Sequence, residues 1–309
     1  MIATRDAYGK VLAELGRENE RVVVLDADLS GSTKTGVFAK EFPERFFNAG
    51  IAEGNMIGMA AGLAAGGMIP FASTFAVFAA GRAFEQIRQS AAYPKLGVKI
   101  VATHAGITVG EDGGSHQAIE DLAIMRALPN MTVLCPADGP ETTAAIRAAA
   151  AHPGPVYVRL GRSKVPVVFP NGCDFAIGRG ATLCEGTDLT FITTGLMSAQ
   201  ALTAAAILAE GGISARVVHL GSIKPLDVEL VLKAARETGA IVTAEEHSVI
   251  GGLGSAVCET LAEGQPVPVE RVGLRDVFGQ SGTADDLLAH YGLTPAYLVE
   301  AAERVLQRK

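Results

Sequence analysis

The feature that most constrains this chain is the regular alternation of short apolar runs with helical patterns. In the first half, apolar runs of strand length lie at 22–25, 98–103, 132–135 and 156–160. Stretches with helical spacing lie at 2–17, 53–65, 81–92, 118–127 and 140–151. Alternation of this kind is typical of βαβ units. It predicts a mostly parallel sheet that is covered by helices.

A second series of the same kind follows. Its strands are predicted at 189–194, 215–220 and 240–244, and its helices at 197–211, 226–238 and 252–263. The stretch between the two series holds Pro166, Pro170 and Asn171-Gly172, which favour turns and extended chain. A length of 309 residues accommodates two domains. We predict a first α/β domain at 1–165, a linker at 166–184 and a smaller α/β domain at 185–309.

Charge and cysteine content exclude several classes of protein. The net charge of -7 argues against binding to nucleic acid or to an anionic membrane, which requires a basic surface. None of the four cysteines forms a CxxC pair, so zinc knuckles and thioredoxin-like chemistry are not indicated. The first residues do not have the pattern of a signal peptide, and we expect a cytoplasmic protein.

Residues 56–81 carry no charge, and the run is long enough to cross a bilayer. Gly66-Gly67 and Pro70 interrupt it, however. We therefore expect no membrane span, but a helix and a following strand that are buried in protein or in a subunit interface.

Polar side chains cluster directly after several of the predicted strands. The carboxyl ends of parallel strands meet at one edge of a sheet, where ligands bind. We therefore expect these side chains to converge on one site. The segments concerned are 26–32 (DADLSGS), 104–106 (HAG), 111–116 (EDGGSH) and 161–163 (GRS).

The segment 103–117 concentrates ionisable groups in a glycine-rich loop. It contains His104, Glu111, Asp112 and His116. These residue types fit acid–base and hydrogen-bonding work on a polar small molecule. They also fit a metal site built from His104, Asp112 and His116, or a loop network that satisfies only itself. The spacing leaves the three interpretations open.

The predicted helix at 53–65 begins with Glu53, beside glycines at 50, 54, 58, 62 and 66. This spacing forms a flat stripe on which another helix can pack closely. A carboxyl group there would be partly desolvated by a partner, which suits it for proton transfer. Alternatively, Glu53 is an ordinary first-turn glutamate that is stabilised by the helix dipole.

Five further residues are candidates, and most of them also have an ordinary structural explanation. Phe75 and Phe78 have the spacing of a core pair. Asp28 could bind Mg²⁺ or cap the next helix. Arg5 has the position of a surface residue. Arg162 follows a strand and is a candidate phosphate ligand.

In their order along the chain, these segments resemble the C-terminal half of transketolase, a thiamine-diphosphate enzyme. The resemblance covers nearly the whole chain, is densest over 1–165, and implies a pyrimidine-binding-type domain followed by a transketolase C-terminal-type domain. The matching stretches are 3–5 (ATR), 26–30 (DADLS), 46–53 (FFNAGIAE), 70–75 (PFASTF), 102–107 (ATHAGI), 109–117 (VGEDGGSHQ), 128–131 (LPNM), 136–139 (PADG), 245–247 (EEH) and 251–255 (GGLGS).

The resemblance implies cofactor contacts. Glu53 matches the glutamate that hydrogen-bonds the cofactor's aminopyrimidine and so promotes its activation. Phe75 and Phe78 match the aromatic wall that stacks on that ring. Asp28 matches an acid close to the cofactor.

It also implies substrate contacts. His104 and Asp112 match positions near the reactive hydroxyl groups of the donor ketose, and His116 matches a nearby loop histidine. With Glu53, the two histidines are the predicted catalytic groups. The resemblance assigns the substrate phosphate to Arg5, Ser32 and Arg162.

The departures from the family pattern concern the cofactor site. The Gly-Asp-Gly…Asn motif that holds Mg²⁺ and the diphosphate is missing, so no metal ligand is predicted on this chain. The resemblance implies that an N-terminal transketolase subunit supplies them, in an α₂β₂ heterotetramer. Gly81 stands where a further aromatic residue is frequent, and Gly54-Asn55 replaces polar or basic residues.

The predicted function is therefore that of the C-terminal subunit of a two-chain transketolase. Such an enzyme moves a two-carbon ketol unit from a ketose phosphate to an aldose. One alternative is the β subunit of a 2-oxoacid dehydrogenase E1 component, which has the same domain layout. A second alternative is a non-catalytic partner that completes or regulates an assembly. His104, Asp112 and His116 favour recognition of sugar hydroxyl groups.

Overall fold

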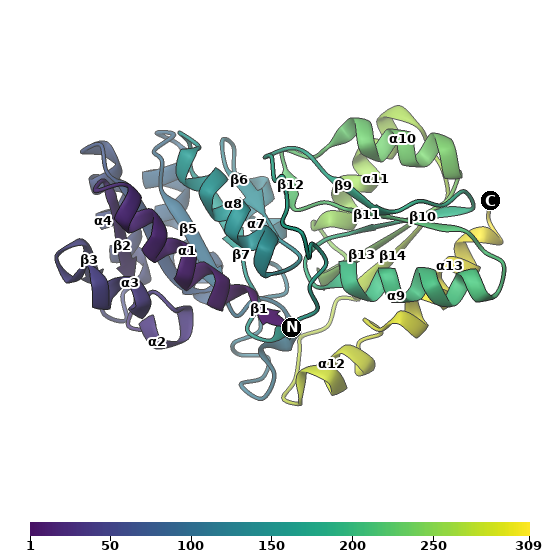
Figure 1. Cartoon of the computed structure of the whole chain (residues 1–309), viewed down its shortest axis with the longest axis horizontal. Coiled ribbons are helices and arrows are strands. Elements are labelled where there is room, and N and C mark those ends of the chain that lie inside the picture. Colours follow the sequence, from purple (N-terminus) through teal and green to yellow (C-terminus); the bar gives the residue numbers. More distant parts are fainter.

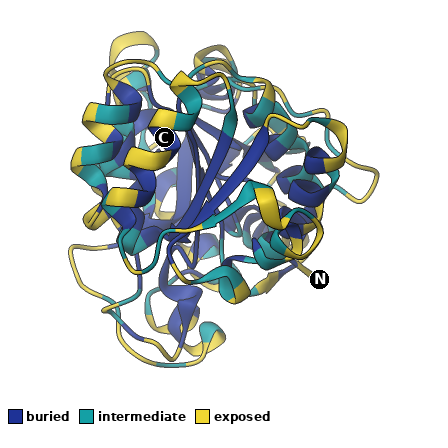
Figure 2. Cartoon of the chain, turned by 90° about the vertical axis from the view of Figure 1, so that its left-hand side faces the viewer, coloured by how far each residue is buried: buried dark blue, intermediate teal, exposed yellow.

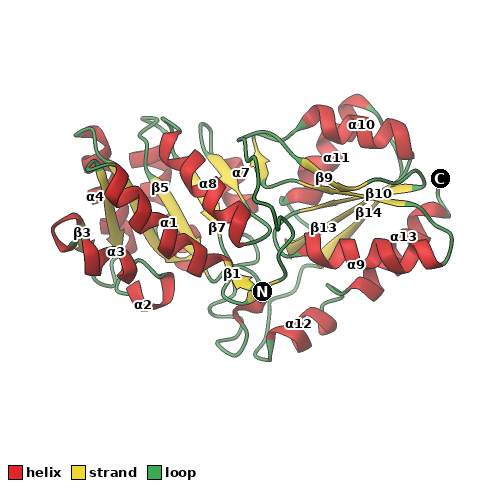
Figure 3. Ribbon diagram, viewed as in Figure 1, coloured by secondary structure: helices red, strands yellow, loops and turns green.

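The computed structural model describes residues 1–309 as two α/β domains that lie side by side (Figure 1). In each domain a sheet is covered by helices (Figure 3). The short strands β1 (Ile2–Ala3) and β8 (Lys164–Val165) pair antiparallel between the N-terminus and the end of the first domain. The predicted fold class is confirmed.

The first domain is built on a seven-stranded sheet in the order β12-β6-β7-β5-β4-β2-β3. All strand pairs are parallel except β12–β6, and most predicted strands lie within a residue or two of their expected bounds. The strands are β2 (Val22–Asp26), β3 (Phe46–Asn48), β4 (Ile69–Phe75), β5 (Lys99–Thr103), β6 (Thr132–Leu134), β7 (Val156–Arg159) and β12 (Ser222–Lys224).

Helices cover both faces of this sheet and follow its strands in βα order. Figure 2 shows the buried strands in the middle and the exposed outer faces of the helices around them. The helical elements are α1 (Thr4–Glu18), α2 (Ser30–Thr33), α3 (Gly36–Glu41), η1 (Pro43–Arg45), α4 (Glu53–Ala65), α5 (Ala76–Gly81), α6 (Phe84–Gln86), η2 (Ile87–Ala92), η3 (Ile107–Val109), α7 (Asp121–Ala127) and α8 (Gly139–Ala151).

The uncharged run folds as α4 followed by β4, as predicted, and none of the chain's helices has the length and apolarity to cross a bilayer. The single helix predicted at 81–92 is wrong. Helix α5 begins directly after β4, and a short α-turn and the π-helical segment η2 follow it. The apolar face of Ala79, Ala83 and Ile87 stays buried through these changes, so burial is retained although the helical period changes.

The second domain has a five-stranded sheet in the order β14-β13-β10-β11-β9. Its strands are parallel except β9, which lies at the end of the range 166–184 that is predicted as a linker and pairs antiparallel with β11. The elements are β9 (Ala181–Cys184), β10 (Leu189–Thr193), α9 (Met197–Glu210), β11 (Ala215–His219), α10 (Val228–Thr238), β13 (Ile241–Ser248), α11 (Leu253–Gly264), β14 (Val269–Leu274), α12 (Ala284–His290) and α13 (Pro295–Leu306).

The two domains are joined by buried polar contacts as well as by apolar packing. Strand β12 of the second half adds to the edge of the first sheet, where Ser222 lies opposite Leu134. At the junction, buried Arg159 pairs with buried Asp121 at 3.0 Å. Arg159 Nη2 also donates to the backbone oxygen of Glu246 in β13 at 2.9 Å. The junction is therefore a specific interface that orients one domain against the other.

Candidate active site

The carboxyl edge of the first sheet, at the lower side of that domain in Figure 1, gathers most of the predicted site residues. Each comes from the end of a strand or from a neighbouring helix. Phe75 ends β4, His104 directly follows β5, and Ser32 lies in α2, after β2. Arg5 lies in the first turn of α1, and Arg162 follows β7.

His104 lies at the centre of this edge. Its backbone has a φ of 59°, a left-handed conformation that is uncommon for a residue other than glycine and frequent at functional sites. The imidazole stacks on Phe75 with a centroid distance of 3.8 Å. Its Nδ1 lies 2.8 Å from Thr103 Oγ1, and its Nε2 lies 3.4 Å from Arg5 Nη1.

These contacts determine the protonation of His104. Burial, followed by the positive charges of Arg5 and Arg162, lowers the pKa of His104 to about 3, so the ring is neutral at pH 7. A guanidinium group can only donate, so Nε2 is the acceptor. The proton is then on Nδ1, which donates to Thr103. The one lone pair of Nε2 faces Arg5 at 3.4 Å, a long contact that a substrate hydroxyl would have to replace in order to donate to His104.

Arg5 retains unused donor capacity. Its Nη1 donates to the backbone oxygen of Ser32 at 2.9 Å, while its Nε is buried without a hydrogen-bond partner. Burial, with a contribution from the positive charge of Arg162, lowers the pKa of Arg5. A guanidinium group in this state favours a bound anion, because the anion would satisfy Nε and offset the repulsion from Arg162.

Arg162 holds the glycine-rich loop to the same edge. Its Nη1 donates to the backbone oxygen of Val109 and lies 3.6 Å from a carboxylate oxygen of both Glu111 and Asp112. Asp112 is exposed, and its ion pair is with Arg162, not with a histidine. The loop therefore carries its acidic groups beside the guanidinium group of Arg162.

An aromatic wall connects this cluster to Glu53. The rings of Phe75 and Phe78 are nearly parallel, with centroids 5.8 Å apart, and His116 meets Phe78 edge-on at 5.6 Å. The guanidinium group of Arg82 lies 4.1 Å from the centre of the Phe78 ring and donates to Glu53 Oε1 at 3.0 Å. Glu53 is only 4% exposed. A buried carboxylate, a long cationic side chain and an aromatic pair thus contact one another in that order along the edge.

Asp28 lies apart from the cluster. It is exposed, has a φ of 62°, and accepts a hydrogen bond from Asn48 Nδ2 at 3.0 Å. Its neighbour Asp26 is fully buried and accepts hydrogen bonds from Leu29 N, Thr33 and Thr35, so its role is to hold the turn after β2. The structure records no contact of Asp28 with the histidines or arginines of the cluster.

Sequence reasoning missed two residues of the site. Arg82 follows the uncharged run and gives no local signal, because its contact with Glu53 depends on how α5 lies against α4. Thr103 has the pattern of a strand residue, although its hydroxyl accepts the hydrogen bond from His104 Nδ1. Both contacts arise from tertiary structure.

No group of three or more His, Cys, Asp or Glu side chains in the chain could hold a metal ion. His104, Asp112 and His116 therefore do not form a metal site of this kind.

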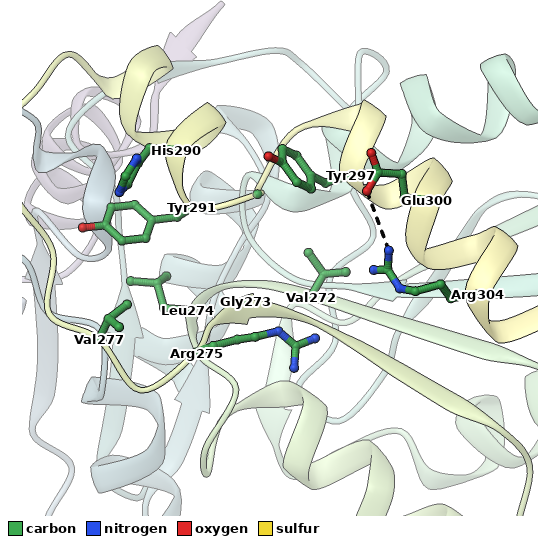
Figure 4. Close-up of a pocket in the computed structure, with 11 residues that line it drawn as sticks. Val272, Gly273, Leu274, Arg275, Val277, His290, Tyr291, Tyr297, Glu300 and Arg304 are labelled. Atoms are coloured by element: carbon green, nitrogen blue, oxygen red, sulfur yellow. Dashed lines mark ion pairs between the residues drawn. The ribbon is translucent and has the colours of Figure 1, made fainter.

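A cavity of ≈ 420 Å³ lies in the second domain, beside the edge strand β14 and between α12 and α13 (Figure 4). Its Arg304 pairs with Glu300 at 3.7 Å and with Glu270 at 3.4 Å, so its charges are mutually satisfied.

The fold and the site together define a class of two-domain α/β proteins with a candidate ligand site at the carboxyl edge of the first sheet. The family comparisons are more specific. Residues 1–168 match the model for the transketolase pyrimidine binding domain, and residues 178–298 match the model for the transketolase C-terminal domain. The chain belongs to the transketolase family.

Several relatives are chains of similar length. A putative transketolase C-terminal section from Methanocaldococcus jannaschii is 57% identical, over 94% of this chain and 92% of that protein. A 6-deoxy-6-sulfo-D-fructose transketolase subunit from Clostridium sp. is 46% identical, over 99% of this chain and 95% of that protein. A solved structure described as a split gene transketolase, inactive beta4 tetramer, has 61% identity, a TM-score of 0.94 and full coverage of both chains.

Proposed function

We propose that this chain is the C-terminal subunit of a two-chain, thiamine-diphosphate-dependent transketolase. In this proposal it works with an N-terminal subunit and transfers a two-carbon ketol unit from a ketose phosphate to an aldose. The observation that carries the proposal is the single cluster of neutral His104, cationic Arg5 and Arg162, and an aromatic wall that leads to buried Glu53. Such a cluster suits a ligand that has hydroxyl groups, a phosphate and an aromatic ring.

The residues present fit the aminopyrimidine half of thiamine diphosphate. Glu53 has one carboxylate oxygen bound only by Arg82, whose side chain is 54% exposed and able to move away. The parallel Phe75 and Phe78 rings provide an apolar wall beside it. No cluster for Mg²⁺ is present, so we assign the diphosphate and the metal to the partner subunit. When bound, the cofactor supplies the carbon nucleophile of ketol transfer.

This chain's own residues then have distinct tasks. Glu53 would hydrogen-bond the pyrimidine ring through its carboxyl oxygen, in a setting where burial strengthens that bond. His104 would accept a hydrogen bond from a donor hydroxyl at Nε2, in place of its long contact with Arg5, and Asp112 and His116 would border the same space. Arg5 and Arg162, with Ser32 beside them, would bind the phosphate through charge-assisted hydrogen bonds. Asp28, which lies outside the cluster, would contact the cofactor.

The outer face of α4 supports a subunit contact beside Glu53. A Cβ at Gly58 or Gly62 would meet nothing within 4 Å, and Met59 between them is 36% exposed. Ile51, just before the helix, is 76% exposed. Small and apolar side chains at the same edge allow close approach of another chain. The relative described as an inactive β₄ tetramer supports the need for a different partner; we propose an α₂β₂ assembly.

The first experiment captures this chain from its own cells with thiamine diphosphate and Mg²⁺ present and weighs the complex by native mass spectrometry. An equal number of a second chain with bound cofactor is the expected result. A cofactor-saturated homo-oligomer without a partner would contradict the split-site proposal. The captured complex is then assayed for ketol transfer. Activity with a 2-oxoacid and an electron acceptor, but not with a ketose phosphate, would indicate the dehydrogenase alternative.

The phosphate assignment has its own test. Arg5→Leu in the assembled enzyme is expected to raise KM for a ketose phosphate by about tenfold or more, because a charge-assisted contact is lost. The same change should leave KM for an unphosphorylated ketose almost unaltered. Arg21→Leu, an exposed arginine outside the cluster, is the control. Equal losses with both substrates would contradict a phosphate role for Arg5.

A further inference from the structure

A side chain of the second domain holds the glycine-rich loop of the candidate site. Glu246 lies in β13 and is 4% exposed. Its Oε1 accepts a hydrogen bond of 2.7 Å from the backbone N–H of Thr108, in the 3₁₀ turn η3 (Ile107–Val109). This contact joins residues that are 138 positions apart and belong to different domains.

The packing around this carboxylate is close. Gly106 has a φ of 79°, and a Cβ there would collide with the carboxylate of Glu246. The backbone of the loop therefore lies directly on the glutamate. The same residue is fixed at its backbone, because Arg159 of β7 donates to its carbonyl oxygen at 2.9 Å. Glu246 is thus held by the first domain at both its main chain and its side chain.

The turn that Glu246 holds also carries the contacts of Arg162. The backbone oxygen of Val109 accepts from Arg162, and the backbone oxygen of Thr108 accepts from Ser163 Oγ at 3.0 Å. A shift of the turn would move these acceptors, and with them the guanidinium group that faces Asp112. The position of the proposed phosphate ligand consequently depends on the second domain.

We propose that Glu246 is a positioning residue of the transketolase site: through Thr108 it holds the turn at 107–109 and so places Arg162 for the substrate phosphate. This inference rests on the proposed function for its catalytic consequence only. It also assigns a task to the second domain, which contributes no side chain directly to the cluster. Burial raises the pKa of Glu246, and the Arg159 charge and the Thr108 N–H limit that rise.

The chain offers a matched control in the adjacent residue. Glu245 is also buried in β13 and also accepts backbone N–H groups, from Leu253 at 2.7 Å and Gly254 at 2.8 Å. These donors lie at the start of α11, within the second domain. Glu245→Ala therefore removes a buried carboxylate from the same strand without touching the loop.

The test uses the complex of this chain with its N-terminal subunit and thiamine diphosphate. Glu246→Ala is expected to raise KM for a ketose phosphate by about tenfold while kcat changes little, because an unmet N–H and a misplaced guanidinium group affect binding. An unphosphorylated ketose should be affected much less. Glu246→Gln, which keeps an acceptor oxygen, should restore most of the loss, and Glu245→Ala should not reproduce the pattern. A loss that is equal for both substrates, or shared by Glu245→Ala, would overturn the proposal.

A second measurement is independent of activity. Hydrogen exchange on this chain alone should show that the Thr108 amide is protected, and that Glu246→Ala increases exchange at 106–110 by at least about tenfold relative to Glu245→Ala. Unchanged protection in Glu246→Ala would overturn the positioning role. Should the complex show no ketol transfer, the proposed function fails, while this measurement still decides whether Glu246 holds the loop.

Discussion

The two domains have similar parallel sheets, but the polar groups at their strand ends differ in how fully they are hydrogen-bonded. In the second domain these groups are hydrogen-bonded: Thr193 bonds to Ser198, Ser198 bonds to His219, and His219 reaches Glu141 in α8 of the first domain at 2.9 Å. In the first domain, Arg5 has a buried nitrogen without a partner and His104 has a strongly lowered pKa. Unused hydrogen-bonding capacity at a strand edge thus separates a ligand site from a structural network.

The largest expected effect is a loss of ketol transfer. It distinguishes two buried glutamates that each lie in the first turn of a helix. Glu53 of α4 has one exposed arginine as its partner, whereas Glu141 of α8 is bonded by Ala137 N at 2.6 Å and by His219. In the assembled enzyme, Glu53→Gln should lower ketol transfer by about 10²- to 10⁴-fold, because a group for proton chemistry is lost. Its unfolding temperature should stay close to that of the unmodified chain.

Glu141→Gln should show the reverse, with lower stability and nearly normal activity per folded complex. Steady-state kinetics and thermal unfolding of both variants provide the measurement. Full activity of Glu53→Gln would contradict the proposed mechanism. Normal activity in every variant of the cluster would instead support the non-catalytic alternative.

The second effect is a loss of folding stability when the buried ion pair at the domain junction is broken. Asp121 is fully buried, bonds to Arg159 Nε at 3.1 and 3.0 Å, and accepts from Tyr157 Oη at 2.8 Å. Asp121→Ala leaves the guanidinium charge buried without a counter-ion, and should cost about 3–5 kcal/mol of stability. Urea unfolding at fixed protein concentration measures it. Glu41→Ala, which breaks an exposed pair with Arg17, should cause no measurable change.

A smaller loss for Asp121→Ala would mean that the junction relaxes when the charge is exposed. Separate unfolding transitions of the two domains in this variant would show that the ion pair couples them.

The buried imidazole of His104 makes the stability of the chain depend on pH. His104 has a pKa of about 3 in the folded chain and about 6.5 when unfolded. Between these values the unfolded state binds more protons, so the stability that His104 contributes is present above pH 6.5 and is lost as pH falls toward 3. From pH 6.5 to pH 5, the unmodified chain should lose about 2 kcal/mol more than His104→Asn. His290→Asn, at an exposed histidine, should behave like the unmodified chain.

The other titrating groups are shared by the compared proteins and cancel in the difference. Parallel losses in the unmodified chain and in His104→Asn would show that the imidazole is protonated in the folded state. The tautomer that we assign, with Nε2 as an acceptor, would then be wrong.

The local sequence pattern predicts the helices and strands of both domains better than it predicts the contacts between them. Helix α4 starts at Glu53 and ends before Gly66-Gly67, as expected, because glycine interrupts a helix whatever surrounds it. Strand β12 is absent from the predicted elements, since its three residues pair with β6 of the other domain. The contacts from Arg82 to Glu53 and from Glu246 to Thr108 likewise depend on tertiary packing. Residue types at strand ends indicate where the site lies. Which side chains contact one another there can be learned only from the structure.

The smallest expected effect concerns the open face of α4, where the same substitution should have opposite consequences in two states. Gly58 lies inside the helix, is exposed, and leaves open space where a Cβ would lie, with no other atom within 4 Å. Gly58→Ala should stabilise the isolated chain by up to about 1 kcal/mol, because alanine loses less conformational entropy in a helix. If a partner packs against this face, the added methyl group should weaken assembly, as seen in the fraction of complex by native mass spectrometry. Thr203→Ala, on the exposed side of α9, should also favour helix but leave assembly unchanged. Stabilisation without weaker assembly would place the partner on another face of the first domain.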